Sequence, residues 1–131
     1  GKQTVKRIIA NGKNIVDAKV LVMGATFKED VSDIRNSKVV DVVRELESFS
    51  VNVDLVDPHA DAKELFEEYG LHLTTEMTND YDAVIVAVNH QEYANMNEDD
   101  FITLMKDKAG VLVDVKGIFK GKISELDYWS L

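Results

Sequence analysis

The sequence contains no cysteine among its 131 residues. This absence excludes disulfide bonds, thiolate metal sites and a cysteine nucleophile within the chain. Long apolar runs are also missing, and none approaches the roughly 20 residues that a membrane-spanning helix needs. The N-terminus lacks the apolar block of a signal peptide. We therefore expect a cytoplasmic protein without a membrane partner.

Cationic side chains are in the minority. The chain has 15 Lys and Arg residues against 24 Asp and Glu residues, which gives a net charge of -9. A general nucleic-acid-binding protein needs a basic face, so no nucleic-acid partner is expected. An anionic small molecule is still compatible with this balance, because the local charge at a site matters more than the total.

Short apolar runs alternate with amphipathic stretches along the chain, whose length suits one domain. Strands are predicted over residues 19–24, 51–56, 71–75, 83–88 and 111–115, with an edge strand or closing segment over 123–131. Helices are predicted over residues 1–17, 37–49 and 60–69, and from residue 97 onward. This alternation predicts an α/β fold with three layers: a doubly wound, Rossmann-like parallel sheet in the strand order 3-2-1-4-5.

The ends of the predicted helices carry capping signals. Asn36 or Ser37 is expected to cap the helix that follows. Asn97 is expected to cap the last helix, where Asp99 and Asp100 are better interpreted as charges favoured by the helix dipole than as an acid/base pair. The helix over 60–69 is predicted to turn Leu65, Phe66 and Tyr69 inward and to end at Gly70.

The stretch from Lys19 to Ser37 combines a strand, a charged loop and a helix start. Free backbone N–H groups and the positive end of the helix dipole face such a loop, which makes it a common anion-binding arrangement. Lys28 offers a point charge and Arg35 a bidentate fork for a phosphate or carboxylate. Two alternatives stay open. Arg35 could instead pair with Asp30 or Asp33 and staple the loop, and Lys28 could be a solvated lysine.

Ligands of doubly wound sheets bind beyond the carboxyl ends of the strands, where the winding reverses. This reversal is predicted between the strands at 19–24 and 83–88. Four side chains that are far apart in the sequence then fall on one edge: Lys28, Arg35, His90 and Lys116. Each keeps the alternative of an ordinary loop residue. Phe27 lies at the same edge, either as part of the core or as a lid against a ligand's base or sugar.

The glycine-rich fingerprint of dinucleotide-binding loops is absent, since Gly24 follows the first strand alone. Asp57 ends the second strand, where such proteins often place a ribose-binding carboxylate. Without the glycines, the Asp57-Pro58 pair is better interpreted as a strand-ending turn. The three histidines, His59, His72 and His90, are too scattered in the sequence to predict a metal site.

Four short motifs stand out along the sequence. The segment from Gly24 to Asp41 reads G-A-T-F-K-E-D-V-S-D-I-R-N-S-K-V-V-D, and it is followed by V-D-P at 56–58, A-V-N-H-Q-E-Y at 87–93 and V-D-V-K-G at 113–117. Together they resemble the C-terminal, UDP-binding domain of the UDP-glucose/GDP-mannose dehydrogenase family over nearly the whole chain. The first segment is most similar to the branch that oxidises UDP-N-acetylhexosamines for capsule or surface polysaccharide.

The resemblance implies one part of an NAD-dependent nucleotide-sugar 6-dehydrogenase, which oxidises the 6-hydroxyl of a UDP-sugar to a carboxylate. In that family an N-terminal Rossmann domain holds NAD, and a central region carries the cysteine nucleophile and forms a homodimer or higher oligomer. Residues 1–18 would then end the linker helix, and residues 19–131 would bind the UDP-sugar. By position, Phe27, Lys28 and Lys116 are expected to contact substrate and Arg35 to face the cofactor. Without the cysteine, the chain alone is expected to be inactive.

Two other functions compete with this expectation. A stand-alone receiver-like module could use Asp57 as a phosphoacceptor, although the position after the first strand holds Gly24-Ala25 rather than clustered acids. Alternatively, the domain could itself bind NAD.

Overall fold

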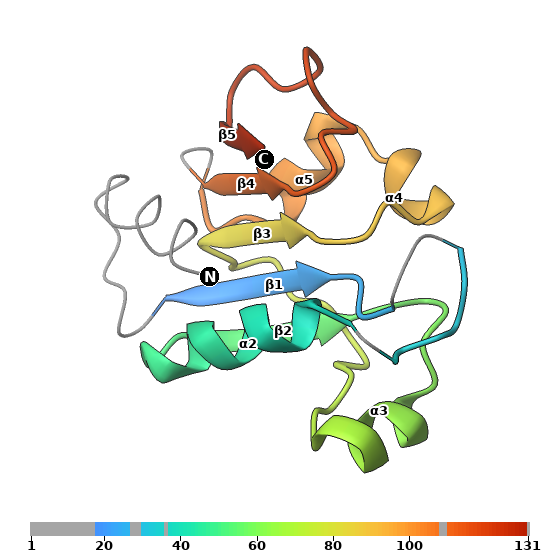
Figure 1. The fold of residues 1–131 in the computed structure, drawn as a ribbon. Coiled ribbons are helices and arrows are strands. Elements are labelled where there is room, and N and C mark those ends of the chain that lie inside the picture. Colours follow the sequence, from blue (N-terminus) through green and yellow to red (C-terminus); the bar gives the residue numbers. More distant parts are fainter. Residues whose placement is uncertain (1–17, 27–29, 36, 108–109, 131) are drawn as a thin grey trace.

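Five parallel strands run through the centre of the molecule in the order β2-β1-β3-β4-β5 (Figure 1). They are β1 (Lys19–Met23), β2 (Asn52–Val56), β3 (Ala83–Val86), β4 (Val111–Asp114) and β5 (Asp127–Ser130). The structure, a computed structural model, describes residues 18–26, 30–35, 37–107 and 110–130. The predicted helix over residues 1–17 lies outside this part. The parallel α/β sheet expected from the sequence is confirmed.

Residues 71–75 do not form the predicted third strand. Thr74 touches β2 at one point only: its N–H donates to the Leu55 carbonyl (2.7 Å) and its hydroxyl accepts from the Leu55 N–H (3.2 Å). Leu71 and Leu73, whose alternation suggested a strand, are partly buried against the core from a loop. The predicted strand order is therefore wrong at this edge. β2 ends the sheet here, and β5 is added beside β4 at the other edge.

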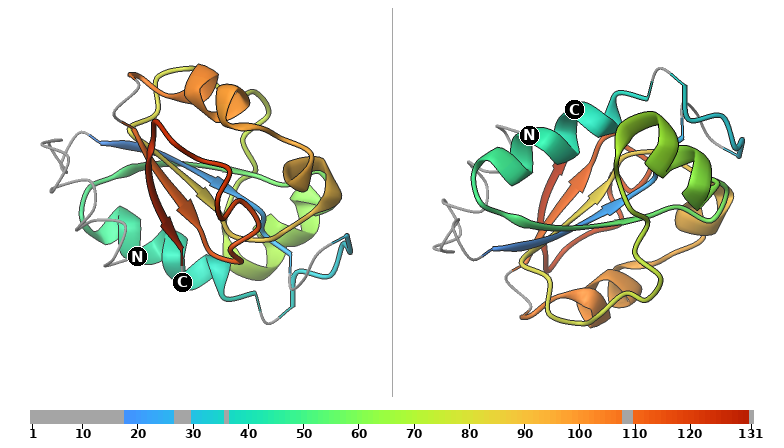
Figure 2. Two further views of the ribbon diagram at one scale, coloured as in Figure 1. Left: turned by 90° about the horizontal axis from the view of Figure 1, so that it is seen from above. Right: turned by 90° about the horizontal axis from the view of Figure 1, so that it is seen from below.

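Helices cover both faces of the sheet (Figure 2). α2 (Val39–Ser48) and α3 (Ala62–Tyr69) lie on one side, and α5 (Glu98–Leu104) lies on the other, with the short α4 (Gln91–Ala94) near the end of β3. The residues of β1 alternate between the two layers. Val20 and Val22 belong to the apolar cluster of α2, and Leu21 and Met23 belong to that of Phe101 in α5. The three-layer, doubly wound arrangement is thus confirmed.

The helix ends agree with the sequence at two points and differ at one, and one side chain is oriented differently from the prediction. Gly70 ends α3 with a φ of 70°, and Asn97 forms a capping box with Asp100 at the start of α5, as predicted. Ser37, however, does not cap α2: the cap position is Lys38, so Ser37 lies one residue too early. Phe66 is 50% exposed rather than inward.

The carboxyl ends of β1, β3 and β4 lie level with one another. Met23 is in register with Val86, and Val86 is in register with Asp114. The loops that follow these strands therefore leave the sheet at one edge, on the right of Figure 1. The winding reverses between β1 and β3, because the connections on either side of this pair run over opposite faces.

Candidate functional site

Gly24 sets the direction of the loop that leaves β1. Its φ of 111° lies in the region that only glycine adopts readily. A β-carbon at this position would lie 2.7 Å from the Cβ of Val88, so the loops after β1 and β3 pass in close contact. The isolated glycine therefore permits close packing between two loops.

The carboxylate of Asp57 fastens this loop to β2. Its Oδ2 accepts hydrogen bonds from the N–H groups of Ala25 (2.6 Å) and Thr26 (3.3 Å), and its Oδ1 accepts from those of His59 (2.7 Å) and Ala60 (3.0 Å). Burial alone raises the pKa of Asp57, but these donors outweigh it and hold the pKa below its usual range. The strand-ending turn is confirmed. Both oxygens are engaged, which argues against the phosphoacceptor alternative.

His90 completes the same network from the loop after β3. The side chain is fully buried, and its Nε2 lies 2.9 Å from Asp57 Oδ2 and 3.2 Å from the Thr26 hydroxyl. Its Nδ1 accepts the N–H of Asp30 at 2.8 Å. An acceptor at Nδ1 places the ring proton on Nε2, which donates to Asp57. The interpretation of His90 as a hydrogen-bonded loop residue is therefore the correct one, and neither nitrogen is directed at solvent.

Asp57 and His90 together hold both ends of the segment that carries Lys28. Ala25 and Thr26 are bound on one side and Asp30 on the other. Asp30 adopts a φ of 57°, and its Oδ1 accepts the N–H of Gln91 at the start of α4 (2.8 Å). Phe27 and Lys28, the two residues expected to contact substrate, lie outside the described residues.

Arg35 forms the pair with Asp33 that the sequence left as an alternative. Its Nε and Nη2 donate to the two carboxylate oxygens at 3.1 and 3.2 Å. The pair lies on the surface, with the Arg35 side chain 79% exposed. The hydrogen bonds from Arg35 lower the pKa of Asp33. The guanidinium is therefore occupied within its own loop, although its exposure leaves it accessible to a competing anion.

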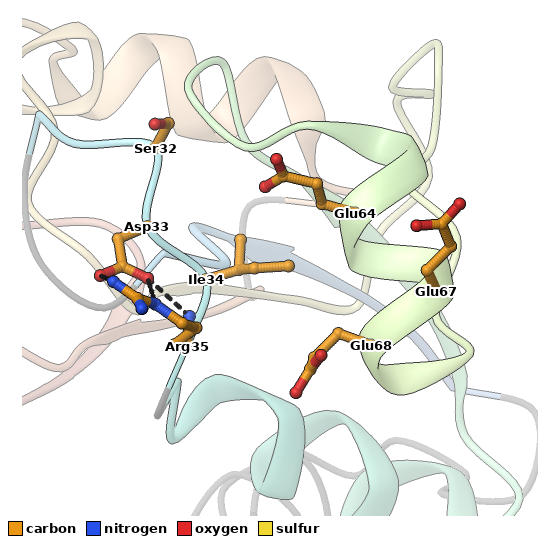
Figure 3. Close-up of a pocket in the computed structure, with 7 residues that line it drawn as sticks. All are labelled: Ser32, Asp33, Ile34, Arg35, Glu64, Glu67 and Glu68. Atoms are coloured by element: carbon orange, nitrogen blue, oxygen red, sulfur yellow. Dashed lines mark hydrogen bonds and ion pairs between the residues drawn. The ribbon is translucent and has the colours of Figure 1, made fainter.

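A cavity of about 540 Å³ lies between this loop and α3 (Figure 3). It is lined by Ser32, Asp33, Ile34, Arg35, Glu64, Glu67 and Glu68. Figure 3 shows the Arg35 guanidinium folded onto Asp33, while Glu64 and Glu68 extend from α3 on the loop side and Glu67 lies on the other side of this helix. Four carboxylates against one guanidinium give a negative potential, so this cavity does not suit a pyrophosphate.

Lys116 stands on a rigid turn at the carboxyl edge of β4. The buried carboxylate of Asp114 accepts the N–H groups of Ile118 (3.1 Å) and Phe119 (2.7 Å) and the hydroxyl of Tyr128 (2.5 Å). Burial and the bond to Asp114 raise the pKa of Tyr128 to about 12. Lys116 is exposed, and within the part of the chain that the structure describes no ion pair engages its ammonium. Sequence reasoning missed Asp114, although an acid that ends an apolar strand was a signal for it.

His59 and His90, which are far apart in the sequence, lie side by side, whereas His72 packs on Phe66 of α3. Their ring centroids are 4.5 Å apart. The Nε2 of His59 lies 3.0 Å from Glu92 Oε1 and 3.9 Å from Asp30 Oδ1. The hydrogen bond to Glu92 raises the pKa of His59 above its ordinary value. His59 follows β2 and His90 follows β3, so the two strands that flank β1 bring them together.

Among the described residues, no helix has the length and apolar character required to cross a bilayer.

Comparison with known proteins identifies the domain type. Residues 21–121 match the family model of the UDP-glucose/GDP-mannose dehydrogenase family, UDP binding domain. UDP-N-acetyl-D-glucosamine 6-dehydrogenase of Salmonella typhi is 41% identical over 126 residues, which are 95% of this chain and 29% of that protein. Protein CapL of Staphylococcus aureus is 38% identical over 115 residues, 87% of this chain and 27% of its own. The chain thus spans less than a third of the length of these relatives.

Solved structures agree with this match. The UDP-N-acetyl-mannosamine dehydrogenase Cap5O of S. aureus superposes with a TM-score of 0.73 at 28% identity, over 98% of this chain and 28% of that one. NDP-N-acetyl-D-galactosaminuronic acid dehydrogenase of Methanosarcina mazei Go1 gives a TM-score of 0.80 over 98% of this chain and 28% of its own. At 20% identity, this second likeness concerns the fold alone.

Proposed function

The chain belongs to the UDP-glucose/GDP-mannose dehydrogenase family, and we propose that it binds the UDP moiety of a UDP-sugar within an NAD-dependent 6-dehydrogenase. The substrate of the whole enzyme would be a UDP-N-acetylhexosamine or UDP-glucose, oxidised to a uronic acid for capsule or surface polysaccharide. The observation that carries the proposal is the common carboxyl edge of β1, β3 and β4, from which the motif segment and the turn of Lys116 both emerge; among the described residues, no ion pair engages the Lys116 ammonium.

The proposal assigns UDP-sugar binding to this chain and the oxidation itself to the rest of the enzyme. Residues 1–18 would end a linker helix and residues 19–131 would form the UDP-sugar-binding domain. The oxidation needs a cysteine nucleophile and NAD as hydride acceptor, and this chain has no cysteine and no glycine fingerprint. Its residues therefore do not fit NAD binding by themselves. We assign both functions to upstream regions, and we propose that the full enzyme is a homodimer or a higher oligomer.

Within the domain, Phe27, Lys28 and Lys116 are proposed as substrate contacts. The lysines would pair with the diphosphate as point charges, and the aromatic ring would lie beside the nucleotide. The network of Asp57 and His90 supports this assignment, because it fixes the flanks of the segment that carries Lys28. Arg35 is proposed to face the cofactor from the other domain, with Asp33 exchanged for an anionic group of the ligand.

The proposal can be tested by titrating the ¹⁵N-labelled chain with UDP and following the amide shifts. We expect weak binding, since the rest of the cleft is absent, with shifts along 25–37 and 115–119. Lys116→Gln should weaken binding about five- to tenfold through loss of a charge-assisted contact. Lys106→Gln is the matched control, because Lys106 is exposed at the opposite edge, before β4. It should leave the affinity unchanged.

Three outcomes would contradict the proposal. UDP shifts confined to regions away from Lys116 would remove the site. Equal losses in both lysine variants would show a non-specific charge effect. Shifts along 25–37 with NAD but none with UDP would favour the alternative that the domain binds NAD itself.

A further inference from the structure

The segments that follow three strands bring four potential metal ligands close to one another, and one of the four is the buried His90. Asp30 follows β1, His59 follows β2, and His90 and Glu92 follow β3. One donor atom from each of Asp30, His59 and His90 lies within 4.8 Å of the other two. The family assignment uses none of these side chains for substrate or cofactor.

We propose that Asp30, His59 and His90, completed by Glu92, bind a divalent transition-metal ion such as Zn²⁺. Imidazole nitrogens and carboxylate oxygens are the ligands that Zn²⁺ and Co²⁺ accept in four-coordinate sites. The proposal does not depend on UDP binding, because it rests on this cluster alone.

The distances between the donor atoms suit such a site after a small contraction. The Nε2 of His59 lies 3.0 Å from Glu92 Oε1 and 3.9 Å from Asp30 Oδ1, and the Nδ1 of His90 lies 4.0 Å from Asp30 Oδ1. Tetrahedral bonds of about 2.0–2.2 Å require donor atoms roughly 3.3–3.5 Å apart. Movement of the partly exposed Asp30 and His59 side chains would bring the three donor atoms to this spacing, and Glu92 would approach the ion from its place beside His59.

The hydrogen bonds of His90 identify Nδ1 as the nitrogen that could coordinate an ion. Its Nδ1 carries a lone pair that accepts the Asp30 N–H, while its Nε2 donates to Asp57. A carboxylate behind a ligating imidazole is the usual second-shell arrangement, since it orients the ring and raises its basicity. An ion at Nδ1 would replace the hydrogen bond from the Asp30 amide.

Local charge also favours a cation. Among the described residues, the two imidazoles are the only basic groups within ion-pairing distance of Asp30 and Glu92. The carboxylate of Asp57 lies directly behind His90. An ion bound here would connect the loops after β1, β2 and β3 and would fasten the residue that follows the Lys28 segment.

The test is a titration of the untagged chain with Co²⁺ and with Zn²⁺. We expect one ion per chain, with the intense visible absorption of four-coordinate Co²⁺, and a rise in melting temperature with Zn²⁺. His59→Gln and Glu92→Gln change half-exposed residues outside the buried network and should each weaken binding by about tenfold or more. His72→Gln is the matched control, because His72 is exposed and stacks on Phe66 of α3. It should bind as the parent chain does.

The proposal would be overturned if Co²⁺ kept the weak spectrum of the hydrated ion. It would also fail if His72→Gln weakened binding as much as His59→Gln. Binding that left the imidazole ¹⁵N resonances of His90 unshifted would remove His90 from the ligand set and would refute the site as proposed.

Discussion

Two buried carboxylates, Asp57 after β2 and Asp114 at the end of β4, each accept backbone N–H groups of the loops at the carboxyl edge of the sheet. A loop that leaves a parallel sheet exposes backbone N–H groups that lack ladder partners, and a buried N–H without a partner is costly. Asp57 accepts two such groups from the loop after β1 and two from the loop after β2, and Asp114 accepts two after β4. Each carboxylate therefore fixes the shape of a loop at the candidate site, although neither is proposed to touch the ligand.

Asp114→Asn should destabilise the chain by about 2–4 kcal/mol, because an amide nitrogen would face N–H donors inside the protein. Tyr128→Phe removes only the hydroxyl donor to the same carboxylate and should cost about 1 kcal/mol. Urea unfolding monitored by the single tryptophan measures both. A loss in Asp114→Asn no larger than that in Tyr128→Phe would show that the bonds to the turn contribute little.

At the scale of the elements, α5 and β5 are joined through Glu98. This carboxylate accepts the N–H groups of Ser124, Glu125 and Leu126 at 2.8–3.1 Å, just before the edge strand begins. β5 is four residues long and only partly buried, so its place beside β4 depends on this anchor as well as on the ladder. Partial burial raises the pKa of Glu98, but the donors outweigh it and the net pKa is lowered.

Glu98→Gln should therefore lower the free energy of unfolding in a pH-dependent way. A carboxyl whose pKa is lower in the folded state stabilises the fold above its unfolded pKa, near 4.3, and loses this contribution as the pH falls through the folded value. The difference between parent and variant should be about 1 kcal/mol at pH 6–8, a modest figure because the group is largely solvated. It should shrink below about pH 4.

Unfolding in urea across this pH range measures the effect. Glu125→Gln is the control: it changes an exposed carboxylate in the same turn and keeps the backbone N–H that Glu98 accepts. An identical pH profile for the two variants would refute the anchor.

At the scale of the whole molecule, the parallel sheet brings the loops of the candidate site together. The parallel strands place the segments 24–26 and 30–35, 57–60, 89–93 and 115–119 around one edge. The apolar interior on both faces holds these loops in place, since the side chains of β1, β3 and β4 are almost entirely buried. The chain has no cysteine, so these loops do not supply the nucleophile that the proposed two-step oxidation requires.

We therefore expect the 131-residue chain to produce no NADH from NAD and UDP-N-acetylglucosamine or UDP-glucose, as followed at 340 nm. Joining it to an upstream region that supplies the glycine fingerprint and a cysteine should restore activity, and changing that cysteine to alanine should abolish it again. Substrate-dependent NADH formation by the isolated chain would refute this division of work.

Local patterns determined much of this protein. The apolar runs at 19–24, 83–88 and 111–115 predicted buried strands, and their alternation with helices, together with the strand at 51–56, implied parallel crossovers and a shared carboxyl edge. The cap at Asn97 and the end of α3 at Gly70 could be predicted because each depends on a few consecutive residues. The motif segment from Gly24 to Asp41 was sufficient to indicate the family.

Only the tertiary structure decided which partner each polar group meets. Whether residues 71–75 pair as a strand depends on the ladder offered by β2, and they meet it at a single residue. Arg35 had two carboxylates within reach and bonds to Asp33. His59 and His90 are 31 positions apart, yet they touch because strands on either side of β1 end at the same level. Periodicity and capping are properties of neighbouring residues, whereas these contacts depend on how distant segments pack.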